Sequence, residues 1–201
     1  IPWGELLKEA KALTPVLVVI GQKRFDNSHG ILAKNLARKV TSNALVIPEQ
    51  ARRSLRTILV PVDFSAYSAR ALKAAVAINK RLEEPARILA LNVYEMPNVS
   101  AYMMSKTETE FRRMVEEDRM AAFDAFIATH LSEGEENVEQ QLVEKDRPGI
   151  AHYVMDYAKE QDVDFIVMGA RGHSKVELLL LGSVTESVLA GNKHIPTLVV
   201  K

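Results

Sequence analysis

Short apolar runs alternate with longer amphipathic segments over residues 55–201. The runs are Arg56–Val62, Arg87–Val93, Val138–Glu144, Asp164–Met168 and Thr197–Val200. Several are apolar at consecutive positions, which is typical of strands covered on both faces in a parallel sheet. Strands that alternate with helices in this way predict an α/β fold with a doubly wound sheet and right-handed crossovers.

The segments between the runs have helical spacing. The expected helices run from Ser65 to about Leu82, through Phe111 and Phe126 to near Leu131, from Pro148 onward, and from Ser183 onward. Ser65 is suited to an N-cap, and proline is favoured in a first helical turn. Ser183 and Glu186 match the Ser-x-x-Glu capping box, so we expect Ser183 to cap the last helix.

The beginning of the chain resembles its end. Leu6 aligns with Val154 and Ala10 with Ala158, whereas a slightly larger shift aligns Gly30 with Gly182, Val46 with Leu198 and Ile47 with Val199. The change of shift places a deletion between Gly21 and Gly30. We therefore interpret residues 1–48 as the C-terminal half of a degenerate first repeat, 49–54 as a linker and 55–201 as a complete domain.

Two strands alone have an open edge and too small a core to be stable. We therefore expect residues 1–48 to belong to a longer tandem protein whose first strands lie outside this sequence. We also expect Leu45–Ile47 to lie edge to edge with Thr197–Val200. The alternative is that the first 54 residues are an unrelated extension that packs on the domain.

Composition narrows the classes of function. The 26 Lys and Arg residues balance 26 Asp and Glu residues, so no net charge favours nucleic acid or a membrane surface. The sequence has no cysteine, which excludes disulfides and thiolate chemistry and fits a reducing cytoplasm. Its apolar stretches are far shorter than the ~20 residues that span a bilayer. We expect a cytoplasmic protein with neither nucleic acid nor membrane as partner.

The glycine-rich stretch Gly169–Ser183 carries the chemistry. Gly169 and Gly172 allow a sharp turn that exposes backbone N–H groups. Gly182 and Ser183 add further N–H groups, a hydroxyl and the positive end of a helix. Such a set predicts a cradle for a di- or triphosphate, although it is neither a Walker A loop nor the dinucleotide fingerprint.

In this stretch the sequence resembles the universal stress protein family, whose ATP-binding members carry Gly-x2-Gly-x9-Gly-(Ser/Thr) after the fourth strand. Residues 169–183 match that pattern, and the resemblance extends over residues 55–201. It implies a five-stranded parallel sheet of order 3-2-1-4-5, the adenine nucleotide alpha hydrolase-like fold. Ligands bind where such a strand order reverses, here at Asp63 and Gly169.

The resemblance implies an ATP-binding stress-response protein in which the nucleotide regulates the pairing of the two repeats or of two chains in a homodimer. AMP or ADP could replace ATP, and Mg could accompany the nucleotide near Asp63. The expected nucleotide-binding residues are Pro61, Asp63, Val93, Met168, Gly169, Arg171, Gly172, His173, Gly182, Ser183 and Val184. No catalytic residue is assigned, and at most weak ATP hydrolysis is expected.

Structural roles compete with several of these assignments. Asp63 can instead accept N–H groups of its own turn, Val93 can be plain core, and Ser183 can be committed to its helix cap. His173 reads as a solvated loop residue. Lys145–Gly149 replaces a Gly-x-Pro stretch that is frequent in the family, and the first repeat lacks the Gly-x-x-Gly pair, so a single nucleotide site is expected.

Two other functions stay open. The fold could serve as a protein-interaction scaffold that binds no nucleotide. It could also support a slow ATPase or phosphotransferase, for which the sequence offers no general base or metal-ligand set beyond Asp63.

Overall fold

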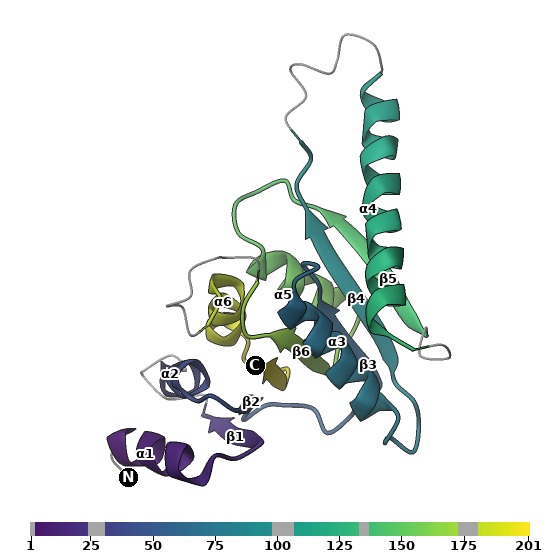
Figure 1. Ribbon diagram of the computed structural model, residues 1–201. Helices are drawn as coiled ribbons and strands as arrows, with labels where there is room; N and C mark the ends of the chain where they lie inside the picture. The colour runs from purple at the N-terminus through teal and green to yellow at the C-terminus, as the bar shows by residue number, and fades with distance from the viewer. Residues whose placement is uncertain (1–2, 24–30, 98–106, 133–136, 173–180) are drawn as a thin grey trace.

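The computed structural model describes residues 3–23, 31–97, 107–132, 137–172 and 181–201. One sheet crosses these residues in the order β1-β2-β7-β6-β3-β4-β5 (Figure 1). Its strands are Leu17–Gln22 (β1), Asn43–Pro48 (β2), Thr57–Pro61 (β3), Arg87–Tyr94 (β4), Val138–Glu144 (β5), Phe165–Gly169 (β6) and Thr197–Val200 (β7). The helices are Trp3–Leu13 (α1), Ile31–Lys39 (α2), Ala66–Asn79 (α3), Glu108–His130 (α4), Ala151–Glu160 (α5) and Ser183–Gly191 (α6). None of these described helices is long and apolar enough to span a bilayer.

The five strands β3 to β7 form a parallel sheet. Their spatial order is β5-β4-β3-β6-β7, which is the order 3-2-1-4-5 when they are counted along the chain. The whole sheet is wider than the expected five strands, and it is mixed. This difference arises because β2 continues the sheet beyond β7 in the antiparallel direction.

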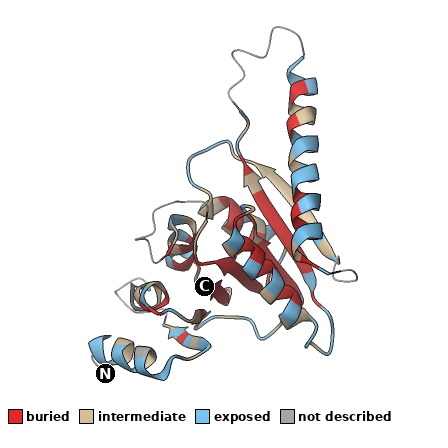
Figure 2. Ribbon diagram, in the orientation of Figure 1, coloured by how far each residue is buried: buried red, intermediate tan, exposed pale blue. Residues whose placement is uncertain are grey.

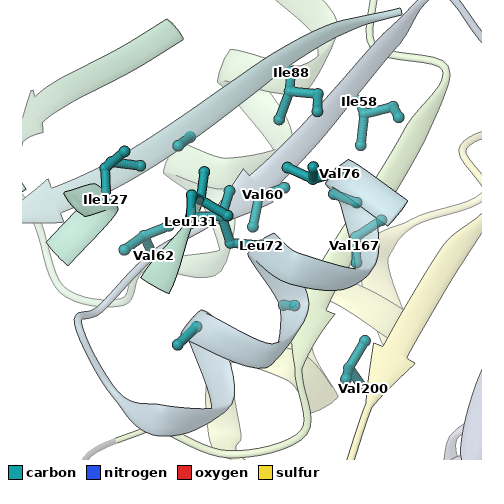
Figure 3. Close-up of a cluster of buried hydrophobic side chains, with 14 of the residues drawn as sticks. Ile58, Val60, Val62, Leu72, Val76, Ile88, Ile127, Leu131, Val167 and Val200 are labelled. Carbon is teal, nitrogen blue, oxygen red and sulfur yellow. The ribbon is translucent and has the colours of Figure 1, made fainter. Parts of the chain in front are cut away.

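Helices cover both faces of the central strands, which are therefore buried and drawn in red in Figure 2. Ile58 and Val60 of β3 pack with Leu72 of α3 and Ile127 of α4 in the apolar cluster of Figure 3. Leu59, between them in sequence, faces the opposite cluster of α5 and α6 residues. Alternate residues of one strand therefore serve two cores, which explains why the run is apolar throughout.

The start of α3 confirms one expected cap. The Ser65 hydroxyl accepts a hydrogen bond from the Ser68 N–H at 3.2 Å. The helix ends at Asn79, earlier than the expected Leu82. Its end is held by the Asn79 side chain, whose oxygen accepts the Ala86 N–H at 2.6 Å and whose amide donates to the Ala86 carbonyl at 3.0 Å.

The start of α5 corrects another expectation. The helix begins at Ala151, not at Pro148. Gly149 has a φ of +88°, a left-handed conformation that turns the backbone just before the helix starts. The Tyr153 hydroxyl accepts the Arg147 N–H at 2.8 Å, so the preceding loop is tied to the helix rather than continuing it.

The N-terminal segment forms the helix-strand-helix-strand unit expected from its pattern. β1 and β2 pair in parallel, and β2 lies antiparallel to β7 with Leu45 opposite Leu198. These are the two segments that the sequence placed edge to edge. The interpretation of this unit as half of a repeat remains a prediction.

Candidate nucleotide-binding site

The candidate site lies where the strand order reverses. β3 and β6 are neighbours in the centre of the sheet, and the chain leaves β3 toward β4 but leaves β6 toward β7. The two connections diverge and leave a crevice at the carboxyl ends of the strands. A cavity of about 250 Å³ occupies this position.

The fold brings the expected residues together. The cavity is lined by Pro61, Asp63, Val93, Met168, Gly169, Arg171, Gly172, Gly182, Ser183 and Val184. The eleventh expected residue, His173, lies outside the described residues. These positions come from three strand ends and one helix start, so only the fold makes them neighbours.

The cavity also contains residues that the sequence pattern did not assign to it: Val62, Ser68, Leu91, Ile150, Val154 and Thr185. Leu91 could have been inferred, because residues two apart on a strand share a face and Val93 was already assigned. Ile150 and Val154 fit the apolar stripe of a helix. Nothing in the sequence showed that this stripe borders a crevice as well as the core.

Two glycines allow close packing at the site. A Cβ at Gly169 would lie only 2.8 Å from the backbone carbon of Tyr67, at the start of α3. A Cβ at Gly172 would collide with the Asp63 carboxylate. The loop backbone after β6 therefore lies directly beside Asp63, and a side chain at Gly172 would fill the space between them.

Asp63 sits in a tight turn between β3 and α3. Its Oδ1 accepts the Ser65 N–H at 3.1 Å, which is the structural role that competed with ligand binding. The next residue, Phe64, has a φ of +62°, and its ring meets those of Phe123 and Phe126 edge-on at 5.4 and 5.5 Å. The aromatic contacts with α4 fix this strained turn, while the Asp63 side chain stays exposed.

The start of α6 corrects the expected capping box. The N-cap is Gly182, without a side-chain cap, and Ser183 is the first helical residue. Glu186 instead forms an ion pair with Arg38 of α2 at 3.5 Å. The prediction failed because glycine and serine are both common N-caps, and the helix begins directly after the glycine. The Ser183 hydroxyl is therefore not engaged in a helix cap.

Two hydrogen bonds hold the positive end of α6 against the end of β6. Thr185 Oγ1 donates to the Gly169 carbonyl at 2.9 Å, and the Gly182 N–H donates to the Ala170 carbonyl at 2.7 Å. The N–H groups of the first helical turn have no partner within the helix. They lie at the cavity wall, together with the Ser183 hydroxyl, where they can bind an anion.

Among the described cavity residues, Arg171 supplies the fixed positive charge. Its guanidinium lies over the Tyr67 ring, 5.8 Å from the centroid. Burial, and then the charge of Arg171, lowers the pKa of Lys201 to about 8. Within the described ranges, no three His, Asp or Glu side chains gather as a metal site. The arrangement suits binding of an anionic ligand with an apolar part better than acid–base catalysis.

Known proteins share this architecture. The universal stress protein MJ0577 of Methanocaldococcus jannaschii is 30% identical over 159 residues, which cover 73% of this chain and 94% of that protein. The structure of the universal stress protein UspA from Lactobacillus plantarum is 28% identical with a TM-score of 0.53, and the match covers 75% of this chain and 100% of that one.

A longer protein matches nearly the whole chain. The structure of a putative universal stress protein from Pseudomonas aeruginosa has a TM-score of 0.68 at 16% identity, over 98% of this chain and 66% of that one. This similarity shows a common fold that includes the N-terminal segment. Residues 54–201 match the Universal stress protein family, and the chain therefore belongs to that family.

Proposed function

We propose that this protein binds an adenine nucleotide, ATP in the first place, in the cavity between β3 and β6 and acts in the stress response. The observation that carries the proposal is the convergence on one cavity of apolar walls, an exposed carboxylate and a glycine-rich anion cradle. Few ligand classes need all three. A nucleotide combines a flat apolar base, a ribose with hydroxyl groups and a chain of phosphates.

The wall residues suggest an orientation for the nucleotide. Leu91, Val93 and Val154 line the apolar part of the cavity and would contact the base. The Asp63 carboxylate would accept hydrogen bonds from ribose hydroxyls. The phosphates would lie at Gly172 and at the start of α6, where backbone N–H groups and the helix dipole favour negative charge. Mg would enter with the phosphates, because Asp63 is the only carboxylate among the described cavity residues.

We also propose that residues 1–48 are half of a degenerate first repeat and that the nucleotide regulates how the two parts pair. α1 and β1 follow each other as α5 and β6 do, and α2 and β2 follow as α6 and β7 do. Both strand pairs are parallel, and their registers differ by one residue from the sequence alignment: Val19 lies opposite Leu45, whereas Val167 lies opposite Leu198, which the sequence aligns with Val46. The match with a longer chain of the same fold supports this reading.

Thermal unfolding with and without Mg-ATP tests the nucleotide proposal. A ligand present at a hundredfold excess over its Kd stabilises the folded state by about 2.7 kcal/mol. For a chain of this size we expect the melting temperature to rise by about 5–10 °C. No rise in the parent protein would favour the scaffold function. Steady phosphate release that Asp63→Ala abolishes would support the ATPase.

A matched pair of glycine variants locates the effect. Gly172→Ala places a Cβ against the Asp63 carboxylate, whereas Gly191→Ala, at the end of α6, meets nothing within 4 Å. We expect Gly172→Ala to lose at least half of the ATP-induced rise in melting temperature and Gly191→Ala to keep it. An equal response from both variants would show that ATP binds elsewhere.

A further inference from the structure

The N-terminal segment packs against both ends of the glycine-rich stretch. Ala170 and Leu181 lie near the two ends of that stretch, and each is 1% exposed. Both belong to one apolar cluster with Leu36 of α2 and Val46 of β2. Because packed cores transmit displacements rather than absorb them, the position of α2 and the shape of the anion cradle depend on each other.

Lys201 joins the two parts by polar contacts. Its Nζ donates to the Ala37 carbonyl of α2 at 2.8 Å, and its backbone N–H donates to Asn43 Oδ1 of β2 at 3.0 Å. The Ala37 carbonyl belongs to the last turn of α2, where carbonyl groups lack helical partners and the dipole attracts cations. A charged Lys201 therefore stabilises α2 in its docked position.

The charge of the same ammonium group is disfavoured by its surroundings, which include Arg171 of the candidate site. Burial and the neighbouring Arg171 charge both disfavour its protonated form, and its pKa falls from 10.5 to about 8. The other charged groups of α2 are Lys34, Arg38 and Lys39, and Arg38 pairs with Glu186 of α6. On the side of Arg171, the Asp63 carboxylate lies beside Gly172.

We propose that Lys201 is a positioning residue that couples nucleotide binding to the docking of α2. Phosphates bound at Arg171 would offset the repulsion between the two cations, so that Lys201 keeps its charge and its bond to Ala37. By linkage, a docked α2 with a charged Lys201 must strengthen phosphate binding by the same factor. The inference rests on the proposed nucleotide function, and it names the contact through which that function reaches the N-terminal segment.

Two substitutions separate charge from shape. Lys201→Arg keeps a positive charge at any accessible pH, and Lys201→Met has a side chain of similar length without a charge. We would measure the Kd for Mg-ATP by calorimetry at about pH 7.5 and about pH 9.5, where the phosphates keep their charge. In the parent protein we expect binding to weaken by about fivefold at the higher pH, because Lys201 loses its proton as the pH passes through about 8.

The variants should lose that pH dependence in opposite ways. Lys201→Arg should bind tightly at both pH values, and Lys201→Met should bind about fivefold more weakly at both. The other titratable groups are the same in all three proteins and would keep their effect in Lys201→Met. A parent-like pH profile in Lys201→Met would therefore overturn the inference.

Hydrogen exchange reports the second half of the coupling. Mg-ATP should slow exchange of the α2 amides in the parent protein and in Lys201→Arg, but not in Lys201→Met. If the parent binds ATP without any change in α2 exchange, the coupling is refuted while the nucleotide function stands. If the parent does not bind ATP at either pH, the proposed function itself is refuted.

Discussion

Two glycines of the site differ in how much space surrounds them. At Gly169 a Cβ would press on the backbone of Tyr67 at 2.8 Å, and backbone atoms cannot turn aside. At Gly182 the nearest atom, the Arg171 Cα, would be 3.4 Å away, which is ordinary contact. The packing of α3 on β6 therefore requires a glycine at position 169, whereas the described atoms around position 182 leave room for a Cβ.

Alanine substitutions at Gly169 and Gly182 should therefore differ in their cost to stability. Gly169→Ala should lower the free energy of unfolding by about 1–3 kcal/mol, the usual cost of overpacking a core. Gly182→Ala should cost no more than about 1 kcal/mol, because it changes only an N-cap without a side-chain bond. Urea unfolding of both variants measures the difference. Equal losses would contradict the close approach of α3 to Gly169.

The elements differ in how far the sequence alone predicts them. Ser65 was correctly predicted as an N-cap, because its hydroxyl accepts a hydrogen bond from the N–H of Ser68, only three residues along the chain. Ser183 was wrongly predicted because the preceding Gly182 is also a suitable N-cap and occupies that position, while Glu186 pairs with Arg38 of a distant helix. Local chemistry was sufficient in the first case but not in the second.

The same distinction applies to the site. The glycine spacing of residues 169–183 is a local pattern, so the sequence alone is enough to recognise the loop. The contribution of Ile150 depends on how α5 docks and on the left-handed Gly149 that delays its start. The Phe64 turn depends on rings that come from α4. Neither feature leaves a pattern in the neighbouring sequence.

Thr185 tests whether the position of α6 matters to the site. Thr185→Val keeps the shape of the side chain but removes the donor to the buried Gly169 carbonyl, and Thr185→Ser restores it. We expect Thr185→Val to lose about 1–3 kcal/mol of stability. We also expect weaker Mg-ATP binding, since the helix start would no longer be tied to β6. A Thr185→Val protein with unchanged affinity in calorimetry would show that this bond serves stability alone.

On the scale of the whole molecule, the strand pairs β1-β2 and β6-β7 are related by an approximate two-fold axis at the junction of β2 and β7, while β3, β4 and β5 lie on one side only. Leu45 faces Leu198 at the centre, while Ala44 faces Val199 and Val46 faces Thr197. This two-fold relation matches Val46 with Val199, whereas the sequence alignment matches Val46 with Leu198. The two alignments differ by one residue because the turn between α2 and β2 is shorter than the turn between α6 and β7.

The uncovered part of the sheet fits the same relation. Val19 of β1 is 59% exposed, whereas Val167, its counterpart in β6, is fully buried in the core beneath α3. Leu17 and Ile47 are exposed on the described surface as well. The face that α3 covers on one side of the junction is bare on the other, as expected if the first repeat keeps only its second half.

Removing residues 1–54 should allow two copies of the shortened chain to pair through β7. Residues 55–201 contain a complete five-stranded sheet and both of its cores, so we expect them to fold alone. Without β2, however, β7 becomes an apolar edge strand, and Leu189 and Val199 lose their cover. Since β2 and β7 pair about a centre at Leu45 and Leu198, a second β7 can take the place of β2 and form an isologous dimer.

Sedimentation should show a dimer of the shortened protein and a monomer when Leu198→Lys places a charge at the centre. A shortened protein that stays monomeric without that substitution would mean that β2 stabilises the edge by contacts that β7 cannot reproduce.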